Sequence, residues 1–319
     1  MLLLITALAC SEKKNCEVKN PIEISFVSLE DSLPNISDKQ QLIGFLTRHP
    51  GIRDLALHRQ SYPDDSVFFD ELYRRFTHPS MDTVLMEVKK VFGDGQALKQ
   101  EFANAFTRLQ QIYPSFQPPK VETVLTGLET DIAVGDTLVI VCLDYFLGAK
   151  AKYRPNMHNY LLRRYEKNFV VPSLILLLGT DKYFNAANSQ DQTVLSDMIA
   201  YGKAYYFAQQ IMPCIADSVW MGYSSEEMEG AQENENYIWK KLVEDEIFYK
   251  DDYRMKQKYI SERPKTFEVS AACPGRIGTW TGWQIVKAYA RRHPNLTLPE
   301  LMKISDANLI FKESKYKPD

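Results

Sequence analysis

The sequence lacks the histidine pattern with which zinc peptidases hold their metal. Its five histidines include no pair four residues apart, and no histidine lies within residues 159–292. Zinc peptidases of the zincin type need two histidines one helical turn apart, with a glutamate beside them as general base. We therefore predict no metal site and no catalytic residues of this type.

Other motifs that carry catalysis or hold cofactors are also missing. The chain has neither a Walker A loop nor a G-x-G-x-x-G turn, so no nucleotide cofactor is expected. Residues 222–226 come nearest to a serine-hydrolase elbow, but Glu226 replaces the second glycine and the segment follows a predicted helix. Ser224 and Glu227 have the S-x-x-E spacing of a capping box, which predicts the start of a helix. The sequence thus indicates no enzyme and no cofactor.

Charge and cysteine spacing exclude two further classes. A net charge of -3 gives no basic surface for nucleic acid, so we expect no nucleic-acid partner. No C-x-x-C pair is present, which argues against a zinc ribbon and a thioredoxin-type redox site. Four cysteines besides Cys10 are scattered along the chain, and whether any form disulfides stays open: Cys16, Cys142, Cys214 and Cys273.

The first ten residues contain an apolar run that is too short to be a membrane span. Residues 2–9 are mostly apolar, whereas a spanning helix needs roughly 20 such residues. The run fits the core of a secretory signal, and the sequence Ala-Leu-Ala-Cys that ends at Cys10 resembles the lipobox of bacterial lipoproteins. We predict a signal peptide at 1–9, acylation of Cys10 and a tether over 10–20. The alternative, a buried N-terminal strand, fits the polar residues after Cys10 less well.

Helical spacing dominates the rest of the chain. Residues 21–26 alternate as a half-buried strand does, and 121–126 and 137–143 are rich in β-branched residues and predict paired strands. Apolar spacing predicts three helices within 64–113 and further helices over 157–167, 172–178, 192–212, 226–249 and 275–292. With no shift in composition, we predict one domain over 21–319. Its fold should be α+β, predominantly helical with a small mixed or antiparallel sheet.

Two predicted helices carry the candidate binding residues. In helix 275–292, Gly278 and Gly282 share one face and would let another backbone approach closely. Tryptophan and arginine are favoured at binding hot spots, although buried packing is the commoner role of large aromatic residues. Helix 192–212 adds polar groups among apolar ones. The candidates are Arg276, Trp280, Trp283, Gln284, Asp197 and Lys203.

From residue 143 onward the chain resembles the gliding-motility lipoproteins of the GldB-like family. The most specific match is 274–286, which reads PGRIGTWTGWQIV. Shorter matches occur in the same order along the chain, at 143–148, 197–203, 212–213, 222–223, 233–239 and 314–318.

The resemblance implies an envelope lipoprotein linked to gliding and to its associated secretion machinery. It also implies distant similarity to zinc peptidases, whose metal-binding helix would fall near 197–208. With no histidine there, the resemblance implies a degenerate zincin-like fold, a pseudopeptidase without metal. We expect a non-catalytic lipoprotein of the outer membrane that faces the periplasm and binds an envelope protein partner. The alternative is a ligand- or peptide-binding protein, or a hydrolase, with a cleft between helices 192–212 and 275–292.

Overall fold

The computed structural model describes residues 18–318. The predicted signal peptide, Cys10, Cys16 and most of the predicted tether lie outside this range. Within it the chain is mostly helical and has one small mixed sheet, as predicted. Buried apolar side chains form a continuous cluster that extends from Ile24 to Ile310. None of the described helices combines the length and the hydropathy needed to cross a membrane.

The sheet has four strands in the order β1-β2-β4-β3. Their bounds are Phe26–Ser28 for β1, Lys120–Val124 for β2, Ile132–Val134 for β3 and Leu138–Cys142 for β4. The two predicted central strands do pair, with Val121 opposite Val139, and they run parallel, as β1 and β2 also do. Strand β3 joins β4 antiparallel, so the sheet is mixed. The strand predicted at 21–26 begins only at Phe26, and the Ile22 amide donates to the Thr107 hydroxyl rather than to a neighbouring strand.

Four helices precede the central strands and lie around the sheet. They are α1 (Lys39–Arg48), α2 (Asp65–Phe76), α3 (Ser80–Phe92) and α4 (Gln96–Ile112). One π-helical turn (Ile52–Ala56) and one 3-10 turn (Arg59–Ser61) connect α1 to α2. The predicted acidic start of α2 is confirmed: Asp64 accepts a hydrogen bond from the Val67 amide at 2.9 Å.

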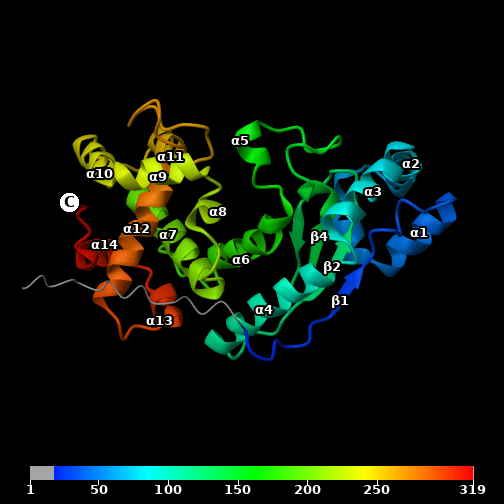
Figure 1. The fold of residues 1–319 in the computed structure, drawn as a ribbon, viewed down its shortest axis with the longest axis horizontal. Helices are drawn as coiled ribbons and strands as arrows, with labels where there is room; N and C mark the ends of the chain where they lie inside the picture. The colour runs from blue at the N-terminus through cyan, green and yellow to red at the C-terminus, as the bar shows by residue number, and fades with distance from the viewer. Residues whose placement is uncertain (1–17, 319) are drawn as a thin grey trace, which may run out of the picture.

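After β4, all the regular elements that the structure describes are helices, joined by loops. The α-helices among them are α5 (Asn159–Leu162), α6 (Val170–Thr180), α7 (Val194–Ile211), α8 (Asp217–Met221), α9 (Ser225–Glu233), α10 (Glu235–Glu244), α11 (Tyr253–Tyr259), α12 (Ile277–Arg292), α13 (Leu298–Lys303) and α14 (Ala307–Ser314). Short 3-10 turns occupy Leu143–Phe146 and Lys167–Phe169. Figure 1 shows α7 and α9 to α14 on one side of the molecule, the sheet with α1 to α4 on the other, and α6 between them.

The predictions for α6, α7 and α12 are confirmed, and those for 157–167 and 226–249 are correct only in part. Only Asn159–Leu162 is α-helical within 157–167. Segment 226–249 is split at Asn234, whose side-chain amide donates to the Gly230 carbonyl at 2.8 Å and competes with the backbone pattern. Helix α10 then ends at Glu244, and Glu246 takes a positive φ of 52°.

Helices α7 and α12 pack directly against each other. A Cβ added to Gly202 of α7 would overlap the carbonyl of Gly282, and one added to Gly282 would overlap the carbonyl of Met198. The close backbone approach predicted from the glycines of helix 275–292 is confirmed. The cleft predicted between these two helices is wrong at this point, because their backbones are in contact.

Candidate functional site

Arg276, the first candidate binding residue, lies in a buried polar network just before α12. Its guanidinium donates to the Tyr205 hydroxyl at 2.8 Å and to the Met221 carbonyl, and its Nε lies 3.4 Å from a carboxylate oxygen of Glu262. Burial acts to lower the pKa of Arg276, but Tyr205 and Glu262 outweigh it and the pKa is raised. The charged side chain therefore ties α7, α8 and the segment before α12 together.

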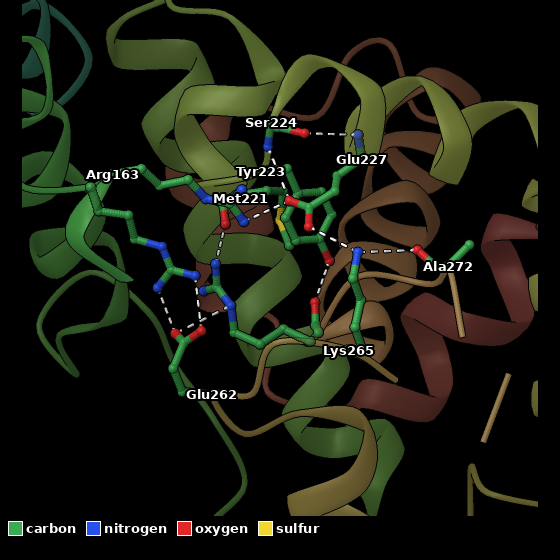
Figure 2. Close-up of polar contacts among 11 residues, drawn as sticks. Arg163, Met221, Tyr223, Ser224, Glu227, Glu262, Lys265 and Ala272 are labelled. Carbon is green, nitrogen blue, oxygen red and sulfur yellow. Dashed lines mark hydrogen bonds and ion pairs between the residues drawn. The ribbon is translucent and has the colours of Figure 1, made fainter. Parts of the chain in front are cut away.

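Further ion pairs extend this network toward the surface. Arg164 binds Glu262 through both guanidinium nitrogens, at 2.5 and 2.9 Å. Arg163 and Lys265 both bind Glu227, at 2.6 and 3.1 Å, as Figure 2 shows. We call these six residues the ionic cluster: Arg163, Arg164, Lys265, Arg276, Glu227 and Glu262.

Glu227 has a second role in this cluster. Its carboxylate accepts from the Ser224 amide at 3.1 Å, while the Ser224 hydroxyl accepts from the Glu227 amide, so the predicted capping box is confirmed (Figure 2). Burial acts to raise the pKa of Glu227, but the Ser224 amide, Lys265 and Arg163 outweigh it and the pKa is lowered. The carboxylate is therefore ionised at neutral pH, and its single negative charge faces two cations, Arg163 and Lys265.

The two candidate tryptophans of α12 lie in the core. Trp280 and Trp283 are 1% and 0% exposed. The Trp283 ring packs 5.5 Å from that of Tyr205, between α12 and α7. Gln284 is half-buried, and its amide reaches only the Trp280 carbonyl, at 3.4 Å. The buried positions of Trp280 and Trp283 fit the alternative role considered from the sequence, which is packing in the core.

The polar candidates of α7 do not meet each other. The ammonium of Lys203 donates to the carbonyls of Ala186, Ile304 and Met302, at 2.6, 2.7 and 3.3 Å. Burial lowers the pKa of Lys203 to about 8. Asp197 instead pairs with Lys256 of α11 at 2.8 Å. Lys203 thus joins the C-terminal segment to α7, whereas Asp197 joins α11 to it.

Beside the ionic cluster, a groove of about 560 Å³ opens between α9, α10 and residues 265–274. We call it the α9 groove. Apolar side chains that line it include Ala231, Ile238 and Val269, and Glu227 and Lys265 of the ionic cluster line it as well. Our sequence predictions missed this groove, because residues 265–274 have no helical or strand periodicity.

Gly230 is the sequence signal that points to the groove. It lies within α9 and lines the groove, and a Cβ added to it would meet no atom within 4 Å. Glycine within a helix costs about 1 kcal/mol relative to alanine. Here no packing contact accounts for that cost, unlike at Gly202 or Gly282.

One wall of the groove is formed by helix α9, which is rich in glutamate. Helix α9 contains four glutamates and no lysine or arginine. Within residues 18–318 its only ion pairs are those of Glu227. Glu226, Glu229 and Glu233 are exposed and make no ion pair with the described part of the chain. Of these three, only Glu226 lines the groove, whereas Glu233 lines a separate hollow beside the C-terminal residues.

The cysteines are in two chemical states. Cys142 and Cys273 are free and buried, whereas Cys214 is disulfide-bonded. Cys273 lines the groove, and burial raises the pKa of its thiol to about 12. A thiol with such a pKa stays protonated at neutral pH and is a poor nucleophile.

A separate hollow of about 590 Å³ lies where α4 meets residues 146–150 and 166–168. Burial raises the pKa of Glu101 in this hollow to about 7, and Lys167 acts in the opposite direction. The carboxyl is therefore partly protonated at neutral pH. Within the described residues, no group of three or more histidine, cysteine, aspartate or glutamate side chains is placed to hold a metal.

The family described as "Gliding motility protein GldB" matches residues 11–318. The chain belongs to this family. The predicted resemblance is thus confirmed, and the match also includes the first half of the chain, where we quoted no matching segment. Membership in the GldB family relates the chain to gliding motility and fits an envelope location. Comparison with curated proteins gives no match, and comparison with solved structures gives none either.

The segment that carries the GldB resemblance most specifically is a packing element. Residues 274–286 lead into α12 and supply Arg276, the two buried tryptophans and the glycine that contacts α7. Replacing these residues would disrupt the packing of α12 against α7 rather than alter an exposed binding surface. The most recognisable part of the GldB sequence therefore specifies the fold.

Proposed function

We propose that this chain is a non-catalytic, membrane-anchored envelope lipoprotein that binds a protein partner in or near a gliding-motility and secretion assembly. The family match over residues 11–318 is the observation that carries the motility context. The lipobox-like sequence that ends at Cys10 supports an anchor of acyl chains such as palmitate. We further propose an outer-membrane location facing the periplasm, since Ser11, Glu12 and Lys13 contain no strongly acidic export tag.

The described side chains support binding more than catalysis. Lys203 and Arg276, the most deeply buried polar candidates, are occupied by carbonyls and by partners within the chain. The α9 groove, in contrast, is open and lined by apolar and charged groups. A ligand- or peptide-binding role remains the alternative. We place its site at the α9 groove, because α7 and α12 leave no cleft where they touch.

Lipid labelling tests the anchor directly. In a gliding host, the wild-type chain should incorporate an alkyne-tagged palmitate and fractionate with the outer membrane. The Cys10→Ser variant should do neither. Recovery of the wild-type chain unlabelled and unprocessed in the cytoplasm would contradict the proposal.

Deletion of the gene tests the motility role separately. Spreading of colonies should be impaired in the deletion strain and restored by the wild-type chain but not by Cys10→Ser. Normal spreading of the deletion strain would contradict a role in gliding and leave the lipid result unaffected.

A further inference from the structure

Cys214, in the turn between α7 and α8, is disulfide-bonded, and the other cysteines leave little choice of partner. The chain has five cysteines, and Cys142 and Cys273 have free thiols. The partner of Cys214 within this chain is therefore Cys10 or Cys16. We infer that it is Cys16, and that the bond fixes the lipid-bearing N-terminus to the turn between α7 and α8. This inference rests on the proposed anchor at Cys10 and adds the point at which that anchor is attached to the domain.

The choice between the two cysteines follows from the chemistry of the anchor. The lipid of a bacterial lipoprotein is attached through the sulfur of its first residue, so an acylated Cys10 has no thiol to oxidise. Cys16 lies farther along the predicted tether and keeps its thiol. Of the two cysteines, Cys16 is therefore the one that can form a disulfide in the anchored protein.

Exposure separates Cys214 from the two free cysteines. Cys142 is 0% exposed in β4, and Cys273 is 6% exposed. Cys214 is exposed at the surface. A disulfide needs Cα atoms about 4.4–6.8 Å apart, which a segment outside the core can reach at an exposed cysteine but not at an enclosed one. The bonded cysteine is thus the one that a surface tether can reach.

The described start of the chain lies close enough to this turn. The Ile22 amide donates to the Thr107 hydroxyl of α4 at 2.9 Å. Glu101, about 9 Å from Thr107 along the axis of α4, lines a hollow together with Ile215, the residue after the bonded cysteine. Helix α4 also contacts α7. The six residues from Ile22 back to Cys16 span up to about 20 Å when extended, so the tether can reach the turn.

Formation of the bond is an oxidation and needs an electron acceptor. The two thiols lose two protons and two electrons as the sulfur–sulfur bond forms. A disulfide of an exported thiol–disulfide oxidoreductase accepts them and becomes two thiols. Such bonds persist in the periplasm and are rare in the reducing cytoplasm. The bond therefore requires the same export as the anchor.

The bond shortens the tether between the lipid and the folded domain. Within residues 18–318, the first hydrogen bond from the N-terminal segment to a helix is that of Ile22, which is twelve residues from Cys10 and up to about 40 Å of extended chain. Cys16 is only six residues from Cys10, or up to about 20 Å. The bond therefore holds the turn between α7 and α8 toward the membrane and restricts rotation of the domain.

Peptide mapping of the wild-type chain tests the bond. The chain is purified from the envelope of a gliding host, its free thiols are blocked with N-ethylmaleimide in denaturant, and its digest is analysed by mass spectrometry before and after reduction. We expect a pair of peptides that contain Cys16 and Cys214 and separate on reduction, with Cys142 and Cys273 blocked by the reagent.

The other outcomes separate this inference from the anchor proposal. A bond between Cys10 and Cys214 would overturn the inference and contradict acylation as well. A free thiol at Cys214, or a bond from it to another molecule, would overturn the inference and leave the result of lipid labelling unaffected.

Neighbouring substitutions in the tether provide a matched control. Cys16→Ser leaves Cys214 without its partner, whereas Asn15→Ser keeps both sulfurs. A maleimide carrying polyethylene glycol should label Cys214 in folded Cys16→Ser, because the residue is exposed. It should not label Cys214 in the wild type or in Asn15→Ser. Equal labelling of Cys214 in all three chains would overturn the inference.

Crosslinking to lipid tests the orientation. A photoreactive phenylalanine analogue replaces Ala216, which is exposed two residues after the bonded cysteine, and native envelopes are irradiated. Because the bond halves the tether, we expect roughly 3-fold more lipid-linked product with Asn15→Ser than with Cys16→Ser. The same analogue at Tyr253, exposed on α11, should show no such gain. Equal lipid-linked product from position 216 in the two backgrounds would overturn the orienting role of the bond.

Discussion

The contact between α7 and α12 and the wall of the α9 groove use the same residue types for opposite purposes. Gly202 and Gly282 let two backbones touch, whereas Gly230 leaves a hollow beside its helix. Lys203 is buried against three carbonyls, whereas Glu226, Glu229 and Glu233 of α9 face solvent and make no ion pair with the described part of the chain. The comparison teaches that the role of a glycine or a charged residue within a helix depends on the groups that pack against it. The sequence alone does not show these groups.

The largest change in stability should come from adding one methyl group where the backbones of α7 and α12 touch. Gly282→Ala would place its Cβ on the Met198 carbonyl of α7, which cannot move as a flexible side chain does. We expect a loss of more than ~3 kcal/mol in the free energy of unfolding, or failure to fold. Urea denaturation followed by circular dichroism measures this. An unchanged midpoint would show that the helices are not in backbone contact.

Lys203→Met should have the next largest effect. It removes the ammonium donor from the carbonyls of Ala186 and Ile304, while the Met302 carbonyl still accepts from the Ala186 amide, and we expect a loss of about 3 kcal/mol at neutral pH. Because burial lowers the pKa of Lys203 to about 8 from 10.5, the unfolded chain binds more protons between these pH values. Wild-type stability therefore gains from Lys203 as pH rises through this window, and the gap to Lys203→Met should widen.

Urea midpoints of both proteins at pH 7 and pH 9.5 check this sign. A gap that narrows toward pH 9.5 would mean that the folded chain holds the Lys203 proton more tightly than the unfolded chain does.

Gly230→Ala should change stability in the opposite direction from Gly282→Ala. Its Cβ enters open space, and alanine favours the helix over glycine, so we expect a gain of ~0.5–1 kcal/mol. Differential scanning calorimetry of both alanine variants beside the wild type makes the comparison direct. A destabilised Gly230→Ala chain would show that something occupies the space at Gly230.

The smallest expected effect is a difference in alkylation rate between the buried thiols of Cys142 and Cys273. Burial raises the pKa of Cys273 to about 12 and that of Cys142 well above its ordinary value, so both should resist alkylation at pH 8 until the chain unfolds. Cys142 is fully buried in β4, whereas Cys273 lies in the groove wall. Mass spectrometry after timed alkylation should show Cys273 modified first, because local opening needs less free energy there. Earlier modification of Cys142 would reverse this ranking.

The sequence was sufficient to predict helices α7 and α12 and their close approach. It was not sufficient to predict the α9 groove. Apolar spacing predicted α7 and α12, and their glycines predicted a close approach, because both signals are local. The partners of Lys203 lie 17, 99 and 101 residues away, so no spacing rule reaches them. The single helix predicted over 226–249 failed because the Asn234 side chain competes with the backbone at the point where α9 and α10 meet. Asn234 at this break lines the groove, whose other wall is the aperiodic segment 265–274.

Site-specific photocrosslinking in the native envelope tests the central claim most directly. A photoreactive phenylalanine analogue at Tyr237 lies on the groove, whereas the same analogue at Tyr253 is exposed on α11 outside it. We predict a crosslinked partner from position 237 that is lost when Gly230→Phe is added, and no such product from position 253. Equal products from both positions, or a product from 237 that survives Gly230→Phe, would contradict the account.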